Sequence, residues 1–363
     1  MPSQKRILFI CPHPVGMVPG QRLKYEQYFQ HFEKEGFEVT VSSFMIPAFQ
    51  KMVYKKGNTP LKIFYTIWGY LLRIRDLLRL PFYDGVYIFL WVTPFGPPIF
   101  EGLFCLLNKN IVYDIDDMVF KGNVSVANKW IRFLKGTSKM KYLMKKAREV
   151  ITSTPYLTNY AKQFNSKITE IYSTVNTDLY IPVNQYTNNK PIVIGWSGSR
   201  STAHYLDGIK PILVQLVQKH NCKILIMSDV PYEIEGVEIE FVKWSEALEI
   251  PTLQRMDIGL YPLPNEEWVL GKSGGKVRQY MALGVPTVAT FTEANEQAIQ
   301  HNLDGFLIHS LEEWKNILNE LIINAELRKS IGIAARETVV NKYSVEANKG
   351  TYISILKRIV AKK

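Results

Sequence analysis

Residues 192–206 read IVIGWSGSRSTAHYL, and this stretch decides how the rest of the chain is interpreted. An apolar, β-rich run over Ile192 to Trp196 enters a loop of small residues, and helical spacing follows over Ala203 to Lys219. Residues 6–22, RILFICPHPVGMVPGQR, have the same order of run and loop, followed by helical spacing over Leu23 to Glu35. Repeated strand–loop–helix units predict an α/β fold with parallel sheets, which bind ligands at the carboxyl ends of their strands.

Further apolar runs continue this pattern in both halves of the chain. We expect strands at 37–42, 85–91, 110–114, 149–153 and 168–171, and again at 223–227, 237–241, 258–261, 287–289 and 305–308. Apolar periodicity stops in an Asn-rich stretch, and a last helix is long enough to cross back onto the first half. We therefore expect an N-terminal domain over 1–182, a linker over 183–190, a C-terminal domain over 191–345 and a returning helix over 346–363.

Composition excludes several classes of protein. A chain of 363 residues predicts about two domains, and 47% hydrophobic with 21% charged residues is too apolar for intrinsic disorder. Cys11, Cys105 and Cys222 are too far apart for a disulfide framework or a CxxC metal site. The first apolar run is too short for a signal peptide, and charges interrupt the most apolar stretch, Leu61 to Trp91. We expect a cytoplasmic protein that does not cross the membrane.

Charge is divided unevenly. Residues 1–182 contain 24 Lys and Arg and 13 Asp and Glu, a net charge of +11, whereas residues 183–363 contain 20 of each sign. Lys51 to Arg79 mixes cations with large apolar side chains as an interfacial amphipathic helix does, and Lys121 to Arg148 has nine basic residues and no acidic one. This pattern favours contact with an anionic membrane surface, with a solvated helix face or ordinary core as the alternative. Nucleic acid is disfavoured, since no binding motif accompanies the charge.

Two loops have the composition of phosphate-binding sites. In Gly195 to Thr202, small residues would let backbone N–H groups approach a phosphate beside the guanidinium of Arg200. The loop fits neither GxGxxG nor the P-loop, and a plain tight turn is the alternative. In Gly271 to Lys276, two adjacent glycines and the cations of Lys272 and Lys276 suit a diphosphate, ahead of a helix expected over Val277 to Leu283. A solvated helix start is the alternative there.

Two loops of the first half are also candidates. Asp114, Asp116 and Asp117 follow an expected strand, and three neighbouring carboxylates repel one another unless partners or function hold them. A Mg²⁺ site, a salt bridge and a helix cap are alternatives. In the loop over 12–22, Gly16, Gly20 and Arg22 could contact phosphate or acceptor, whereas His13 is as readily an ordinary loop histidine.

Five segments together resemble a known family. They are GKSGGKVRQYMALGVPTVAT (271–290), IVIGWSGSRSTAHYL (192–206), YDIDDMVF (113–120), NEQAIQHNLDGFL (295–307) and KYSVE (342–346). The sequence resembles bacterial family 4 glycosyltransferases of the GT-B fold, in particular those encoded in surface-polysaccharide gene clusters. This resemblance implies two Rossmann-like domains facing each other across a cleft. It also implies a sugar-nucleotide donor held mainly by the C-terminal domain, and transfer with retention and without a bound metal.

The resemblance also implies roles for single residues. Arg200 and Lys276 would stabilise the diphosphate, with Lys272 as the other candidate lysine, and Asp116 would stand where the family commonly has a histidine beside the reacting sugar. Donor contacts would fall on Gly195, Ser197, Gly198, Ser199, Lys243, Lys272, Ser273, Gly274, Gly275 and Glu296. Many members have two glutamates eight residues apart, but those positions are Gly271 and Gln279 here. Glu266 or Glu267 could take over from the missing carboxylate.

The expected activity is therefore retaining transfer of a sugar from a nucleotide-diphosphate sugar to a glycan or lipid-linked acceptor. It would serve cell-surface polysaccharide synthesis at the inner face of the cytoplasmic membrane, with no cofactor and no metal. A GT-B-like nucleotide-sugar epimerase is one alternative, although it would have no use for a basic apolar surface. A non-catalytic, membrane-associated nucleotide-sugar-binding protein is the other. A dehydrogenase is disfavoured, because no GxGxxG is followed by an acidic residue about 20 positions on.

Overall fold

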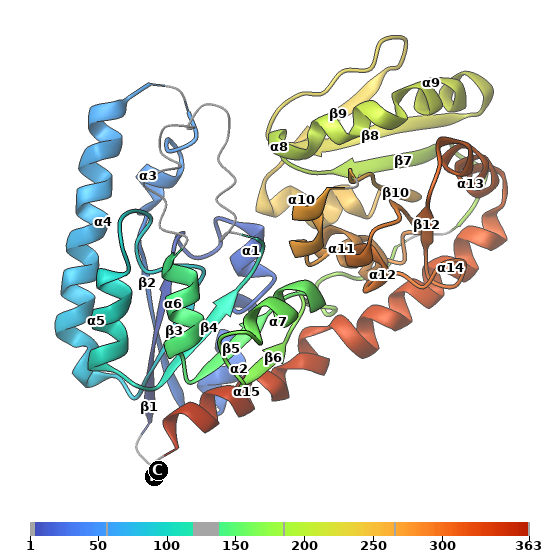
Figure 1. Cartoon of the computed structure of the whole chain (residues 1–363). Coiled ribbons are helices and arrows are strands. Elements are labelled where there is room, and N and C mark those ends of the chain that lie inside the picture. Colours follow the sequence, from blue (N-terminus) through green and yellow to red (C-terminus); the bar gives the residue numbers. More distant parts are fainter. Residues whose placement is uncertain (1–3, 56, 119–137, 184–185, 265, 362–363) are drawn as a thin grey trace. The chain divides into compact units, whose positions relative to one another are not determined.

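The computed structural model describes residues 4–55, 57–118, 138–183, 186–264 and 266–361, and the chain groups into two compact units (Figure 1). The first unit comprises Met1–Ser173, Gly271–Ser273 and Asn348–Lys363. The second comprises Thr174–Leu270 and Gly274–Ala347. The first three residues of the predicted phosphate loop over Gly271 to Lys276 thus belong to the first unit, as does the end of the chain.

A parallel six-stranded sheet forms the centre of the first unit, in the order β2-β1-β3-β4-β5-β6. Its strands are β1 (Lys5–Cys11), β2 (Phe37–Ser43), β3 (Gly85–Phe89), β4 (Ile111–Ile115), β5 (Glu149–Thr152) and β6 (Ile168–Glu170). The chain adds β2 on one side of β1 and then crosses to β3 on the other side. The carboxyl ends of β1 and β3 therefore flank the switch point, which is the usual ligand position in such sheets.

Helices cover both faces of this sheet (Figure 1). They are α1 (Pro19–Arg22), α2 (Phe29–Lys34), α3 (Pro47–Gln50), α4 (Thr59–Arg79), α5 (Ile99–Leu107), α6 (Ser138–Lys146), α7 (Pro155–Ala161) and the end of α15 (Val345–Val360). Aromatic rings fill one side of the core, where Phe9 packs on Tyr25 and Tyr87 with centroids 5.5 and 4.7 Å apart. The ring centroids of Tyr352 of α15 and Tyr28 are 4.5 Å apart, so the last helix returns to the first unit as predicted.

The second unit repeats this architecture. Its parallel sheet has the order β12-β11-β10-β7-β8-β9, with β7 (Ile192–Ser197), β8 (Cys222–Ser228), β9 (Ile239–Lys243), β10 (Ile258–Tyr261), β11 (Thr287–Thr290) and β12 (Phe306–Ile308). Its helices are α8 (Arg200–Ala203), α9 (Lys210–Lys219), α10 (Glu246–Leu253), α11 (Gly275–Ala282), α12 (Glu293–Glu296), α13 (Leu311–Ile323), α14 (Ala325–Thr338) and the start of α15. The switch point lies between β7 and β10, which pair directly.

Every strand expected from the sequence is present, with ends that shift by at most two residues. Two expected helices are interrupted instead. The helix expected over 23–35 begins early, at Pro19, and breaks before a 3₁₀ turn at Glu26–Tyr28, because Lys24 and Tyr25 turn into the core with no exposed surface. The helix expected over 203–219 divides into α8, a 3₁₀ segment at His204–Ile209 and α9. Pro211 lacks the N–H that a continuous helix needs there.

The predicted basic surface of the first unit is smaller than its charge suggests. Lys24, Arg73 and Lys139 are buried, and Lys139 donates to the carbonyl oxygens of Thr93 and Phe95. Much of the expected basic segment over 121–148 lies outside the described residues, as does Lys56. All three cysteines are buried, and none forms a disulfide. Among the described residues, no helix is both long and apolar enough to span a bilayer.

Candidate functional site

The two predicted phosphate loops follow β7 and β10, the strands on either side of the switch point of the second sheet. The first loop enters α8 at Arg200, and the second enters α11 at Gly275. Gly274 precedes α11 with φ of 68°, a left-handed conformation that favours glycine. The sheet thus brings together, at one edge, two segments that are about 70 residues apart in the sequence.

Helix α11 is fixed against β7 by two contacts. The Tyr280 hydroxyl accepts a hydrogen bond from the Ser197 N–H at 2.7 Å, and the Lys276 ammonium lies 5.4 Å from the ring centroid of Trp196. Gly198 lies against the same indole, since a Cβ at this position would be 2.1 Å from it. Lys276 and Gly198 therefore both lie against Trp196, which places this predicted cation next to the first loop.

Several backbone groups of the first loop have partners inside the unit. The N–H groups of Ser197, Gly198 and Arg200 donate to the Tyr280 hydroxyl, the Met227 carbonyl and the Asp229 carboxylate, the last at 2.6 Å. A phosphate bound by these three amides would have to displace those partners. Gly195 lies within β7, where a Cβ would be 2.3 Å from Met256, which gives this glycine a packing reason. The Arg200 side chain lies at an exposed position.

The other predicted donor residues lie at separate places in the second unit. Lys243 is the exposed last residue of β9, and Glu296 is the exposed last residue of α12. Gln279, where the resembled family has a glutamate, is buried and donates to the Tyr180 hydroxyl at 2.7 Å, which in turn donates to Glu249. Glu266, a suggested substitute carboxylate, accepts from the indole N–H of Trp268.

Asp114 is the buried centre of the candidate site in the first unit. Its carboxylate has no exposed surface, accepts a hydrogen bond from the Tyr87 hydroxyl at 2.5 Å and lies 3.3 Å from the Lys24 ammonium. Burial raises the pKa of Asp114 to about 6, and Lys24 opposes that shift. Lys24 also donates to the Ile171 carbonyl at 2.6 Å. Asp114 is therefore a buried structural carboxylate with two partners, Tyr87 and Lys24.

Asp116 and Asp117 have different surroundings. Burial raises the pKa of the Asp116 carboxyl, again against the charge of Lys24, and its Oδ2 lies 3.9 Å from a Cβ built on Gly20. Asp117, with φ of 65°, accepts from the Lys272 ammonium at 2.5 Å. Ser273 shares a hydrogen bond of 2.5 Å with Ser173. Within the described part of the chain, no group of three or more His, Cys, Asp or Glu side chains is arranged to hold a metal ion.

The loop after β1 is held by side chains that sequence reasoning did not single out. Gln21 both donates to and accepts from the backbone of His13, and Glu26 accepts from the Gly16 N–H at 2.9 Å. Gly16 has φ of 77°. Arg22, partly buried, ends the short helix α1. His13 contacts Gln50, and burial lowers the pKa of its ring.

A sequence signal existed for some of the missed residues. The segment after β1 has apolar residues at helical spacing, and three polar residues lie among them, namely Gln21, Lys24 and Glu26. Polar side chains are unusual at positions that face a sheet. No sequence signal connects Tyr280 with Ser197, since this contact depends on how α11 packs on the sheet.

Residues 195–324 match the family model described as Glycosyl transferases group 1. The match covers about a third of the chain and includes both glycine loops, α11 and the segment that contains Glu296. No curated protein has significant similarity to this chain in sequence.

Solved structures resemble the whole chain. A sucrose-phosphate synthase from Thermosynechococcus elongatus has a TM-score of 0.69 at 13% identity, with 98% of this chain and 99% of that chain covered. A glycosyltransferase from Rickettsia africae has a TM-score of 0.68 at 15% identity, with both chains covered completely. HepE from Anabaena, in complex with UDP, has a TM-score of 0.63 at 14% identity, with 97% of this chain and 100% of that chain covered.

The chain has the GT-B fold. The comparisons and the two parallel sheets confirm the predicted α/β class with two Rossmann-like units. HepE structures are also known with UDP and glucose and with UDP-glucose. At these identities the likeness establishes the GT-B fold alone, so the activity of this chain has to be argued from its own residues.

Proposed function

We propose that this GT-B protein is a retaining glycosyltransferase that moves a sugar from a nucleotide-diphosphate sugar to a glycan or lipid-linked acceptor. The observation that carries the proposal is the placement of Arg200 and Lys276 on the two loops that flank the switch point of the second sheet. Both loops lie within the segment that matches Glycosyl transferases group 1. The complexes of HepE with UDP and UDP-glucose support a nucleotide-sugar donor for a protein of this fold.

Catalysis by such a site is electrostatic. As the bond between the anomeric carbon and the diphosphate oxygen breaks, negative charge develops on the leaving group, and Arg200 and Lys276 stabilise it. The acceptor hydroxyl attacks the anomeric carbon from the same face and gives its proton to the departing phosphate oxygen. No metal or cofactor takes part in the proposed reaction. Asp116 is the proposed contact of the first unit with the transferred sugar.

Lys276 is the better candidate of the two lysines for the diphosphate. Lys272 forms an ion pair with Asp117, and its segment groups with the first unit. Lys276 lies in the first turn of α11 and beside Trp196, next to the loop that contains Arg200. A diphosphate at the start of α11 would also benefit from the partial positive charge of that helix end.

The family subtype and the physiological role are part of the same proposal. A family 4 enzyme of surface-polysaccharide synthesis, working at the cytoplasmic face of the membrane, is consistent with the motifs at 271–290 and 295–307. Glutamates are absent at Gly271 and Gln279, and the Gln279 side chain already donates a hydrogen bond to the Tyr180 hydroxyl. These two positions therefore supply no carboxylate to the donor sugar. We therefore expect a donor whose hydroxyl groups are bound without those two carboxylates.

A thermal-shift screen tests the donor site. Ligand that binds only the folded state raises the melting temperature by mass action. We expect one of UDP-, GDP-, ADP- or CMP-sugars to stabilise the native chain, and Arg200→Ala and Lys276→Ala to abolish that shift. Arg255→Ala is the matched control, because Arg255 is a half-exposed arginine of the same unit that pairs with Glu240. No shift with any sugar nucleotide, in folded protein, would contradict the proposal.

A transfer assay then separates the alternatives. The stabilising donor incubated alone should remain chemically unchanged, whereas an epimerase would convert it without any acceptor. With a membrane extract as the source of acceptor, labelled sugar should appear in glycan or lipid. Donor binding without transfer to any acceptor fraction would favour a non-catalytic binding protein.

A further inference from the structure

Helix α4 covers a sheet, but its polar face points toward the sheet and a large apolar face is exposed. Its fully buried positions are Gly69, Arg73 and Asp76. Five of its exposed positions repeat every three or four residues and are large and apolar, namely Phe64, Ile67, Leu71, Ile74 and Leu78, between 47% and 75% exposed. At 3.6 residues per turn, these two stripes lie on opposite sides of the helix. An ordinary surface helix has the reverse arrangement.

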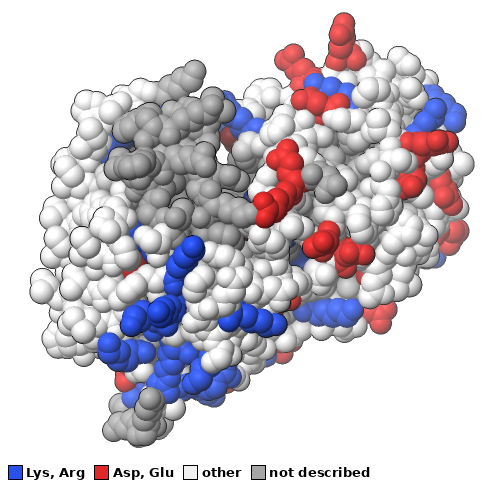
Figure 2. All heavy atoms as spheres, viewed as in Figure 1, with Lys and Arg blue, Asp and Glu red and all other residues white. Residues whose placement is uncertain are grey.

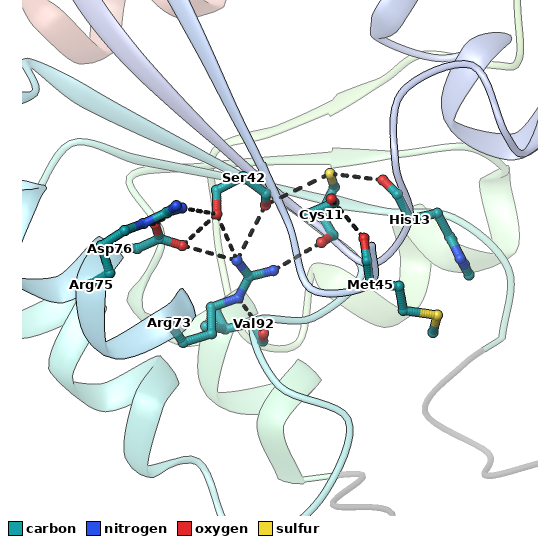
Figure 3. A network of polar contacts seen from close by, with 9 residues as sticks. Cys11, His13, Ser42, Met45, Arg73, Arg75, Asp76 and Val92 are labelled. Atoms are coloured by element: carbon teal, nitrogen blue, oxygen red, sulfur yellow. Dashed lines mark hydrogen bonds and ion pairs between the residues drawn. The ribbon is translucent and has the colours of Figure 1, made fainter. Parts of the chain in front are cut away.

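The inward face is held by a polar network around Arg73 (Figure 3), and beside it Tyr65 and Tyr70 of α4 pack on the rings of Phe49 and Phe44. The guanidinium of Arg73 donates to the carbonyl oxygens of Cys11, Ser42 and Val92 at 2.9, 3.2 and 2.8 Å, and to Asp76 at 3.0 Å. These carbonyls lie at or beyond the carboxyl ends of β1, β2 and β3. The large side chains of the exposed apolar stripe take no part in this network.

Helix α5 extends the same apolar surface. It packs beside α4, with the rings of Tyr70 and Phe100 5.5 Å apart, and the two helices lie side by side along one flank of the unit (Figure 1). Its own exposed residues are Ile99, Leu103, Leu106 and Leu107, between 39% and 66% exposed. We call these residues, with the apolar stripe of α4 and Trp68, the α4–α5 face. A contiguous apolar surface of this kind marks a binding surface.

Basic residues border this face and acidic ones are absent from it. Arg75 and Arg79 are exposed on α4, and Lys109 follows the end of α5, where its ammonium donates to the Cys105 carbonyl at 2.9 Å. The only acidic residues of the two helices, Asp76 and Glu101, are buried. Figure 2 shows Lys and Arg gathered over the lower part of the first unit and few charged side chains along the flank of α4 and α5.

We propose that the α4–α5 face docks on the surface of a bilayer that contains anionic lipid. Apolar side chains of one helix face enter the boundary between headgroups and acyl chains, and the basic border attracts acidic headgroups. Trp68, 44% exposed, has the amphipathic ring that favours this depth. A second copy of the chain fits less well, because it would bring two basic borders together without an acidic partner. No residue of this surface belongs to the proposed donor site.

Vesicle flotation of the full chain tests this surface without any sugar transfer. The vesicles contain phosphatidylcholine alone or phosphatidylcholine mixed with phosphatidylglycerol. Leu71→Glu places a charge in the middle of the face, and Ile333→Glu is the matched control on α14, since the two side chains are 51% and 55% exposed. We expect the native chain to bind the anionic vesicles, Leu71→Glu to bind them at least about tenfold more weakly, and Ile333→Glu to bind unchanged.

Other outcomes overturn the proposal. Failure of the native chain to float with anionic vesicles would exclude the bilayer as the partner. Equal losses for Leu71→Glu and Ile333→Glu, with native circular dichroism, would mean that the face has no special role. A native dimer in sedimentation equilibrium that Leu71→Glu converts to a monomer would assign the face to a second copy. Because none of these readouts involves a donor, a failed transferase assay leaves this test intact.

Discussion

The carboxyl edges of the two sheets differ in where they keep their charge. In the first unit, Arg73, Lys24 and Asp114 are buried and bind backbone carbonyls or one another. In the second unit, small residues fill the first loop and Arg200 lies at an exposed position, while Arg278 of α11 is buried beside Gly274. The same parallel architecture thus buries charge in both units, and in the second unit it also leaves the exposed cation of Arg200 for a ligand. Fold and strand order alone would not distinguish these two uses.

Arg73→Ala is the strongest test of the structural use of charge. Loss of this side chain leaves Asp76 buried beside uncovered carbonyl groups, and we expect the free energy of unfolding to fall by about 3–5 kcal/mol. Arg75→Ala is the control, because Arg75 pairs with the same Asp76 but is 48% exposed. Its loss should cost under about 1 kcal/mol. Denaturant unfolding measures both losses. Equal losses would show that the contribution of an arginine paired with Asp76 does not depend on whether that arginine is buried.

Arg200→Ala tests the functional use of charge in the second unit. If Arg200 stabilises the leaving diphosphate, kcat for transfer should fall by about 100-fold to 1,000-fold. The melting temperature without ligand should stay close to native, because the side chain lies at an exposed position. Arg255→Ala should change neither quantity. A large loss of stability with unchanged kcat would place Arg200 among the structural cations.

Gly195→Ala asks whether a predicted donor glycine is a packing glycine. Because a Cβ would lie 2.3 Å from Met256, the variant should lose about 1–3 kcal/mol of unfolding free energy. Gly208→Ala, where nothing lies within 4 Å of the new Cβ, should be neutral or slightly stabilising. Donor affinity of the folded fraction should be native in both variants. Weaker donor binding with native stability in Gly195→Ala would restore the phosphate interpretation.

The sequence predicted the fold well because the fold depends on local patterns. Apolar runs such as residues 6–11 and 258–261 are bounded by turn residues, and every strand of both sheets was found from them. Helices were harder where tertiary contacts compete with local spacing. Lys24 breaks the first helix by turning inward to Asp114, a pairing that depends on a strand about 90 residues away.

The candidate site was predictable only in part. Its loops could be placed, because strand ends in a parallel sheet share one edge. The partners of each loop could not, because they come from elsewhere in the chain. Ser197 was expected to face a phosphate, but its N–H donates to Tyr280, and Lys272 contacts Asp117. Charge counting also overstated the basic surface of the first unit, since the sequence does not show that Arg73 and Lys139 are buried.

The pH dependence of stability distinguishes two carboxyl groups, one in each unit, by a smaller effect. Burial raises the pKa of Asp114 from 3.8 to about 6, so the folded state holds this proton more tightly than the unfolded state does. Ionisation of Asp114 therefore lowers the free energy of unfolding as pH rises from 3.8 to about 6, with no further change above that range. Asp207, in the second unit, has a pKa lowered by its hydrogen bond from Lys210, so its ionisation affects stability only below pH 3.8.

Replacement of each carboxyl by an amide isolates these contributions. The unfolding free energy of Asp114→Asn minus that of the native chain should rise between pH 4 and about 6 and then level off, because only the native chain loses stability by ionising there. The same difference for Asp207→Asn should be flat over that range. Denaturant unfolding at several pH values measures both curves. A flat curve for Asp114→Asn would mean that the charge of Lys24 offsets the cost of burying this carboxylate completely. Ionisation of Asp114, like that of Asp207, would then leave the unfolding free energy unchanged over this range.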